Sequence, residues 1–240
     1  MSNIKEIADL LSSNSYPGRG IIIGKSSDGT KAMIAYFIMG RSENSRNRIF
    51  EKFEGGMRTK AFDESKLVDP SLIIYNPYLS FGDNVDIITN GDQTNTVYDA
   101  LVFGKHFEDA LATREFEPDA PNFTPRISGI CYYSFPRNVF TYKLSILKSD
   151  DGNPDACNRF YYNYTPVSGE GHFIHTYKCD GNPIPSFEGE PEKVIMPNTA
   201  RELADVVWTN LNSENKVSLF VRCVPLDGST PEEIIINKNV

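Results

Sequence analysis

Residues 16–48 read YPGRGIIIGKSSDGTKAMIAYFIMGRSENSRNR, and this stretch predicts a β hairpin with arginines at one end. Residues 21–23 form an apolar first strand. Residues 32–39 form a second strand that is apolar along its whole length, as in strands covered on both faces. Between them, the Ser-Asp-Gly sequence at 27–29 is a turn signal, because glycine tolerates the positive φ that hairpin turns require. We therefore expect a buried antiparallel pair of strands.

Four arginines flank this hairpin. It begins at Arg19 and ends before Arg41, so antiparallel pairing brings both guanidinium groups to the same end, and Arg46 and Arg48 follow directly. Such a group indicates an anion site, because guanidinium matches phosphate and carboxylate with two parallel hydrogen bonds. Spacing alone leaves the alternative open, that these are solvated rim charges held in salt bridges.

Composition narrows the class of protein. The chain has 240 residues, of which 40% are apolar and 23% are charged, enough for one large globular domain or two small ones. A net charge of −8 argues against general affinity for nucleic acid. We expect neither a membrane span nor a signal peptide, since no apolar run approaches about 20 residues and the first residues include acidic ones. Four scattered cysteines without a C-x-x-C pair predict free thiols, no metal site and a cytoplasmic location.

The remaining pattern predicts an α+β fold, with helices packed against largely antiparallel sheet. A short amphipathic helix is expected over 3–12, and the polar stretch 42–66 reads as a long connection. Further strands are predicted at 72–75, 85–89, 127–134, 140–147, 160–164, 172–179, 216–224 and 234–236. Residues 97–101 lead towards a helix, and helical segments are predicted at 106–116 and 198–211. The proline-rich stretch between 118 and 125 is the best candidate for a domain boundary, but we interpret it as an internal loop.

Several polar residues at strand ends are candidates for a site. Asn90 and Gln93 could bind a heteroaromatic ring or a carboxamide, although Asn-Gly is equally a plain turn. Tyr78 offers a phenol near a turn, and the alternative is that its ring packs in the core. Glu117, like Asp119, precedes the Thr-Pro-Arg sequence, and could act as a general base or pair with an arginine.

The histidines give little support to metal or triad chemistry. His172 and His175 lie three apart on a predicted strand, so they point to opposite faces and joint metal ligation is disfavoured. His106 opens a helical segment, which indicates a structural role. With three histidines in the chain, a Ser-His-Asp hydrolase is also disfavoured.

Five short motifs occur in an order that resembles a known family. They are YPGR at 16–19, GRS…NR at 40–48, NPY at 76–78, TNGDQT at 89–94 and TPRI at 124–127. Together they resemble the archaeal-type inosine monophosphate (IMP) cyclohydrolases and their bacterial relatives, most closely over roughly residues 16–130. The resemblance implies a four-layer αββα sandwich like that of the N-terminal nucleophile hydrolases, without their nucleophile. Residues 16–240 would form a single domain, and residues 1–15 a helical extension.

The implied activity is closure of 5-formamidoimidazole-4-carboxamide ribonucleotide to IMP with loss of water, a step of purine biosynthesis that needs no metal or redox cofactor. The resemblance assigns roles position by position. The phosphate or the formyl oxygen would be held by Arg19, Arg41 and Arg48, with Arg46 competing for the role of Arg48. Tyr78 would donate a proton or contact the ring, Asn90 and Gln93 would bind the carboxamide or ring edge, and Arg126 and Glu117 would complete the site, with Glu117 as the base.

Three departures from the family pattern leave an alternative open. The segment before Tyr16 is extra, the loop between Arg41 and Arg48 is longer, and residues 135–190 are expanded. A purine-nucleotide-binding relative with a changed substrate or no catalysis would fit these differences. We also expect that the protein can form a homo-oligomer. Amide hydrolysis by Ser2 is disfavoured, because a helix rather than a strand follows it.

Overall fold

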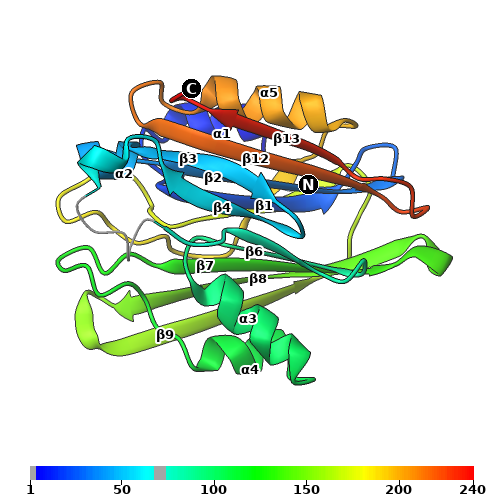
Figure 1. Ribbon diagram of the computed structural model, residues 1–240, viewed down its shortest axis with the longest axis horizontal. Helices are drawn as coiled ribbons and strands as arrows, with labels where there is room; N and C mark the ends of the chain where they lie inside the picture. The colour runs from blue at the N-terminus through cyan, green and yellow to red at the C-terminus, as the bar shows by residue number, and fades with distance from the viewer. Residues whose placement is uncertain (1–3, 68–73) are drawn as a thin grey trace.

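Two antiparallel β sheets lie face to face in the computed structural model, which describes residues 4–67 and 74–240 (Figure 1). The six-stranded sheet has the order β11-β10-β1-β2-β12-β13, with β1 (Arg19–Lys25), β2 (Lys31–Met39), β10 (Glu170–His175), β11 (Glu192–Ile195), β12 (Lys216–Pro225) and β13 (Glu232–Asn237). The seven-stranded sheet runs from β3 to β9 in sequence order, with β3 (Arg48–Phe53), β4 (Gly56–Ala61), β5 (Tyr78–Phe81), β6 (Val85–Thr89), β7 (Arg126–Ser134), β8 (Val139–Asp150) and β9 (Asn153–Tyr164).

Helices cover the outer faces of both sheets, except for the short α2 (Glu43–Arg46), which buries no residue. The others are α1 (Ile7–Ser13), α3 (Gln93–Val102), α4 (Phe107–Ala112) and α5 (Ala200–Asn210), with short 3₁₀ turns at Glu64–Lys66 and Phe135–Arg137. Figure 1 shows α1 and α5 over the six-stranded sheet and α3 and α4 over the seven-stranded sheet. In the described part of the chain, no helix is both long and apolar enough to cross a bilayer. The α+β class with largely antiparallel sheet is thus confirmed.

The predicted hairpin is present and sits in the middle of the six-stranded sheet. Strand β1 pairs antiparallel with β2, with Arg19 opposite Ile38 and Lys25 opposite Ala32. Every residue of β2 after Lys31 is buried, and Gly29 in the turn has a φ of +74°. Both faces of the hairpin are covered because alternate side chains enter different cores. Ile21 and Ile23 pack between the two sheets, whereas Ile22 packs towards α1 and α5.

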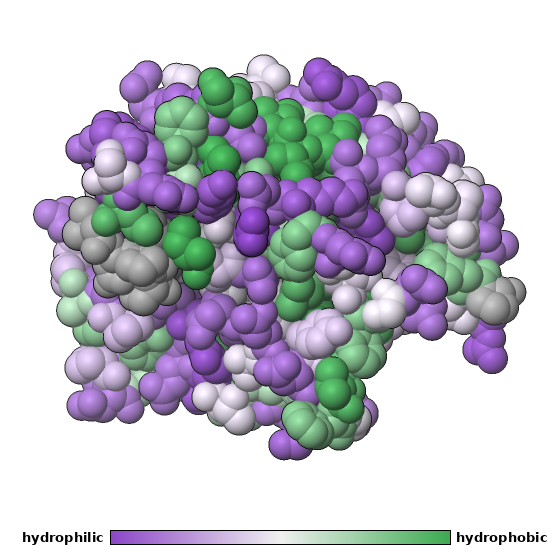
Figure 2. All heavy atoms as spheres, in the orientation of Figure 1, coloured by the Kyte–Doolittle hydropathy of each residue, from purple (hydrophilic) through white to green (hydrophobic). Residues whose placement is uncertain are grey.

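The helix predicted over 198–211 is confirmed as α5. Its start is fixed by a capping box, in which the Thr199 hydroxyl accepts from the Glu202 amide and the Glu202 carboxylate accepts from the Thr199 amide. Strand β13 is at the edge of the six-stranded sheet, and its three isoleucines are half-buried. Figure 2 shows apolar atoms gathered near α5 on an otherwise largely hydrophilic face.

The prediction that 42–66 is a long connection was wrong. This stretch contains α2, β3 and β4. Glu54 and Gly55 form the turn of a hairpin, with Gly55 at a φ of +79°, and Gly56 is the first residue of β4. The polar composition of the stretch has a physical cause, because β3 is an edge strand and the outward face of this hairpin carries Arg58, which is exposed, opposite Glu51.

Other boundaries also differ from the sequence predictions. The strand predicted at 72–75 lies partly outside the described residues, and the next observed strand, β5, begins at Tyr78. Ser2 also lies outside the described residues. The strand predicted at 172–179 ends at His175, after which the chain turns.

A buried carboxylate joins the two sheets away from the hairpin's arginine end. Asp86 on β6 is 2% exposed and accepts hydrogen bonds from Tyr78 Oη, Tyr133 Oη and Arg222 Nε, each at 2.8 Å. Arg222 belongs to β12 of the opposite sheet and also donates to Glu233 at 2.5 Å. A buried ion pair of this kind is costly to break, since the remaining partner is left charged and unsolvated.

We expect Asp86→Ala to lower the free energy of unfolding by about 3–5 kcal/mol, because Arg222 and two phenols lose their shared acceptor. Urea denaturation of the variant and the parent measures this difference. The matched control is Asp83→Ala, at an exposed position in the same hairpin, which should change stability by less than about 0.5 kcal/mol. Equal effects of the two substitutions would contradict the prediction.

Candidate functional site

Chain segments distant in sequence meet at one end of the two sheets. In the six-stranded sheet, the start of β1 pairs with the end of β10, as Gly20 lies opposite His175. In the seven-stranded sheet, the end of β6 pairs with the start of β7, as Thr89 lies opposite Ser128. Arg19, Arg48 and Arg126 are each the first residue of a strand, and their charges act on common neighbours: Arg19 on Arg48, and both Arg19 and Arg126 on Glu117.

Two of these arginines lack a carboxylate partner. Arg48 is fully buried, and its Nε and Nη2 donate to the carbonyls of Ser45 and Met39 at 2.8 and 3.3 Å. Its Nη1, like Nε of Arg19, is buried with no hydrogen-bond partner in the described structure. Within residues 4–67 and 74–240, neither guanidinium forms an ion pair. Burial, and next the charge of Arg19, lower the pKa of Arg48.

Tyrosines make up much of the surroundings of this pair of cations. The electrostatic neighbours of Arg19 include Tyr177, Tyr16, Tyr75 and Tyr36, and its charge also acts on the carboxylate of Glu117. Tyr36 Oη lies 2.8 Å from Tyr75 Oη, and burial raises the pKa of Tyr36 well above its ordinary value. Tyr36 is therefore a neutral hydroxyl at physiological pH, able to donate a hydrogen bond beside two guanidinium groups.

The YPGR motif packs against one of these phenols. The rings of Tyr16 and Tyr177 stack with centroids 5.8 Å apart. Gly18 has a φ of +81°, and a Cβ there would lie 2.3 Å from Thr176 Oγ1 and 2.4 Å from the Tyr177 ring. Only glycine fits both the conformation and the space. The motif therefore shapes the slot that places Tyr177 next to Arg19.

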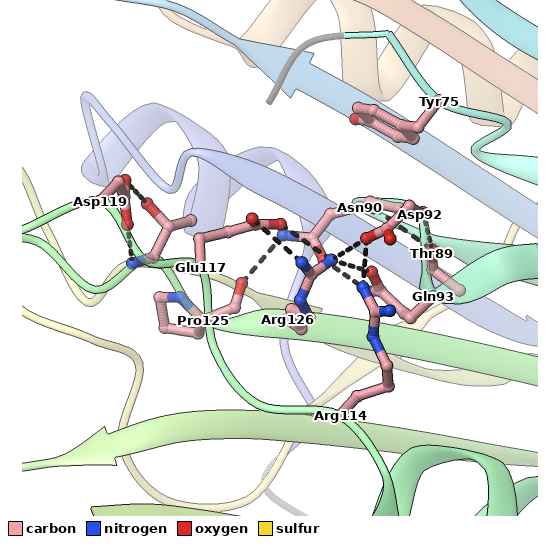
Figure 3. A network of polar contacts seen from close by, with 12 residues as sticks. Tyr75, Thr89, Asn90, Asp92, Gln93, Arg114, Glu117, Asp119, Pro125 and Arg126 are labelled. Carbon is pink, nitrogen blue, oxygen red and sulfur yellow. Dashed lines mark hydrogen bonds and ion pairs between the residues drawn. The ribbon is translucent and has the colours of Figure 1, made fainter. Parts of the chain in front are cut away.

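A second polar network lies beside the arginine pair, shown in Figure 3. Arg126 is clamped by both oxygens of Glu117, with Nη1 2.9 Å from Oε1 and Nη2 3.1 Å from Oε2. Arg126 Nη1 also donates to Asp92 at 2.7 Å and to Gln93 at 2.6 Å. Burial raises the pKa of Glu117, while Arg126 and then Arg19 oppose that rise. The result is a carboxylate with increased basicity at the edge of a cationic site.

Asn90 and Gln93 use their amide groups within the protein. Asn90 donates to the Pro125 carbonyl at 2.9 Å and accepts from the Ile127 amide at 2.8 Å. Gln93 is fully buried, donates to Asn90 at 3.0 Å and accepts from Arg126. The structure thus places both beside the site, supporting Arg126 and the start of β7.

Three other predicted residues lie outside the buried cluster. Arg41 is at the rim, where its Nη1 pairs with Asp180 at 2.5 Å and its guanidinium lies 5.1 Å from the Tyr16 ring centroid. Arg46 donates to the Gly40 carbonyl and to Asn215, at 2.9 and 3.0 Å, holding the α2 turn. Tyr78 belongs to the Asp86 network described above.

The tyrosine lining was only partly predicted. The Tyr-Asn-Pro-Tyr sequence at 75–78 indicated a phenol at Tyr75, whereas Tyr16 was not predicted although it stands in the YPGR motif. Tyr36 lies opposite Ile21 in the hairpin and shares the inner face with Arg19, a relation that strand periodicity could have revealed. Tyr177 follows β10, which pairs with β1 across about 150 residues of chain, and no local signal marks it.

His172 and His175 point to opposite faces of β10, as predicted, although His175 is buried rather than at the surface. His172 Nδ1 lies 2.7 Å from Tyr142 Oη between the sheets, whereas His175 packs against Phe173 on the other face. His106 is the N-cap residue of α4. Among the described residues, no group of three or more histidine, cysteine, aspartate or glutamate side chains is arranged to hold a metal ion.

Fold and site together define an α+β protein with a buried cationic site suited to a small anionic molecule. The chain belongs to the IMP cyclohydrolase-like protein family, whose family model matches residues 16–228. It is 31% identical over 193 residues to the IMP cyclohydrolase of Methanopyrus kandleri, covering 72% of this chain and 89% of that protein. It is also 31% identical over 123 residues to the IMP cyclohydrolase of Methanosphaera stadtmanae, covering 48% and 56%. The family resemblance seen in the five motifs is thereby confirmed.

We expect Gly18→Ala to destabilise the protein by more than about 2 kcal/mol, since it adds steric overlap with Tyr177 to the strain of a positive φ. Gly189→Ala is the matched control, because Gly189 has a φ of +87° but open space around its Cβ, and should cost only about 1 kcal/mol. Chemical denaturation measures both. Equal losses would show that Gly18 is required for its backbone conformation alone.

Proposed function

We propose that this protein is an enzyme that closes 5-formamidoimidazole-4-carboxamide ribonucleotide to IMP with loss of water, in purine biosynthesis. The observation that carries the proposal is the pair Arg19 and Arg48, two neighbouring guanidinium groups with buried, unpartnered nitrogens and no carboxylate partner in the described structure. Such a pair is stabilised by an anionic ligand. Membership of the family, and relatives named IMP cyclohydrolase, identify a purine ribonucleotide as that ligand.

The reaction sets clear demands on the site. The carboxamide nitrogen attacks the formyl carbon, a C–N bond forms, and the formyl oxygen gains negative charge. One proton leaves the attacking nitrogen and another leaves the former formamide nitrogen, and the oxygen departs as water once both have been transferred to it. Holding the two groups face to face supplies much of the rate, and donors aimed at the developing oxyanion supply more.

Arg48 is the residue best suited to the formyl oxygen. Its unpartnered Nη1 is deeply buried, where a charge-assisted hydrogen bond is strongest. The neighbouring Tyr36–Tyr75 pair supplies a neutral hydroxyl that can protonate or bind the same oxygen. Arg19 lies beside Arg48, and Arg41 at the rim would bind the phosphate in exchange for its present partner Asp180.

Glu117 is the candidate base. Burial raises the pKa of its carboxyl group, which makes the carboxylate a better proton acceptor, and Arg126 keeps it oriented and ionised. Figure 3 shows Tyr75 across from the Glu117 network, so base and acid candidates lie on opposite sides of the same region. Asn90 and Gln93 would act by supporting Arg126, and Tyr78 and Arg46 are not assigned to substrate.

The organisation of the chain is part of the proposal. We take residues 16–240 as one catalytic unit, with residues 1–15 as an added helical segment, which agrees with a family match that begins at residue 16. The succession of helix, sheet, sheet and helix supports a relation to the N-terminal nucleophile hydrolase fold. A role in purine biosynthesis also fits a cytoplasmic enzyme.

The central test mixes the purified protein with the formamido ribonucleotide and follows IMP formation by ultraviolet absorbance. Arg48→Gln should lower kcat/KM by about 100-fold or more, because one donor to the developing oxyanion is lost. Arg46→Gln is the control, since that guanidinium serves the α2 turn, and should stay within about twofold of the parent.

Absence of turnover by folded parent protein would reject the cyclohydrolase assignment. Thermal stabilisation by IMP under those conditions would favour the nucleotide-binding relative instead, because binding without chemistry still raises the unfolding temperature.

Glu117→Gln should reduce kcat by about 10²–10⁴-fold while IMP binding is retained, since the amide keeps the shape but accepts no proton at the relevant pH. In the parent, activity should fall on acidification at a pH above the ordinary glutamate range, because burial raises the pKa of Glu117 and protonation removes the base. A pH–rate profile from pH 4 to 9 measures this limb. An unchanged kcat in the variant would remove Glu117 from the mechanism.

A further inference from the structure

Four side chains of alternating charge run from the surface to the site: Arg114, Asp92, Arg126 and Glu117 (Figure 3). Asp92 is 53% exposed, whereas Arg126 and Glu117 are only 9% and 14% exposed. Asp92 Oδ1 pairs with Arg114 and accepts from Arg126 at 2.7 Å. Arg126 is therefore shared between a surface carboxylate and the candidate base.

We propose that Asp92 and Arg114 are positioning residues that hold Arg126 in place and so set how readily Glu117 accepts a proton. The catalytic part of this inference rests on the proposed function, whereas the coupling between the four side chains does not.

The position of Asp92 supports a role beyond local structure. Asp92 is the N-cap residue of α3, where an aspartate ordinarily accepts from the backbone amides of the first turn. Here its side chain makes no cap hydrogen bond and is directed to the two arginines instead. A cap of this kind is worth about 1 kcal/mol, so the helix start forgoes a stabilising contact in favour of the network.

Gly91 permits the close approach. A Cβ at this position would lie 2.5 Å from Arg126 Nη1, 2.6 Å from Gln93 Oε1 and 3.0 Å from Glu117 Oε1. The loop backbone thus lies directly against the ion pair, and a side chain there would push Arg126 and Glu117 apart. The TNGDQT motif, which runs to residue 94, builds this contact.

The charges facing Glu117 come from four parts of the fold. Arg126 on β7 and Arg19 on β1 favour its ionised form, whereas Asp92 before α3 and Asp119 in its own loop disfavour it. Neutralising Asp92 removes a repulsion and leaves the Arg126 charge entirely to Glu117, which lowers the pKa of Glu117. Neutralising Arg114 leaves Asp92 uncompensated and draws Arg126 towards Asp92, which raises the pKa of Glu117.

The test measures Glu117 directly, without turnover. Protein labelled with carboxyl-¹³C glutamate is titrated by NMR, and the Glu117 resonance is assigned from its loss in Glu117→Gln. Asp92→Asn should move the Glu117 titration to lower pH by roughly half a unit, the effect of one partly screened charge nearby, and Arg114→Gln should move it the opposite way. Asp205→Asn and Arg201→Gln are matched controls, taken from an exposed ion pair of 3.0 Å on α5, and should leave it unchanged.

The same variants then separate this inference from the proposed function. Opposite NMR shifts, accompanied by equal and opposite shifts in the acidic limb of kcat/KM, support both. Opposite NMR shifts in a protein that forms no IMP uphold the coupling and reject the proposed function. Shifts that are absent or of the same sign, in variants whose thermal unfolding matches the parent, overturn the positioning role even if IMP is formed.

Discussion

An unneutralised guanidinium inside a protein is the constraint on which the site depends. Arg48 is fully buried with one nitrogen unpartnered, and Arg19 lies close enough to lower its pKa further. Removing such charges from water costs several kcal/mol each, and carbonyl acceptors recover only part of it. The fold tolerates this pair because it lies at the end of two sheets that pack tightly together, where an anionic ligand can supply the missing negative charge.

The contrast with Arg222 shows that the missing partner is not forced by burial. Arg222 is also largely buried, yet it forms ion pairs with two carboxylates, Asp86 and Glu233. The pair with Asp86 connects the two sheets. The electrostatic neighbours of Arg19 and Arg48 include several phenols, and Glu117, the carboxylate on which the Arg19 charge acts, is paired with Arg126. Phenols give polarity and hydrogen bonds without neutralising the cations, so positive potential is preserved for an incoming anion, in a chain whose net charge is −8.

Sequence reasoning succeeded where a relation is local. The hairpin and the shared end of Arg19 and Arg41 follow from turn chemistry and apolar runs, and the possibility that Glu117 pairs with an arginine was visible from its spacing to Arg126. It failed where tertiary context decides. The edge strand β3 and its neighbour β4 carry polar residues on one face and therefore resemble a loop in sequence, and Arg46 and Arg48 are two residues apart yet have different surroundings. Tyr177 reaches the site only through pairing of β10 with β1, which no short pattern encodes.

The location of α1 determines which part of the fold a change in this segment affects. Ile7 and Leu11 are buried in the core under α5, and Lys5 pairs with Glu192 on β11 at 2.7 Å. The segment therefore thickens the outer helical layer on the side of the six-stranded sheet that faces away from the inter-sheet space (Figure 1). Substitutions in α1 act first on the packing under α5, and the thickness of the six-stranded sheet separates them from the space between the sheets.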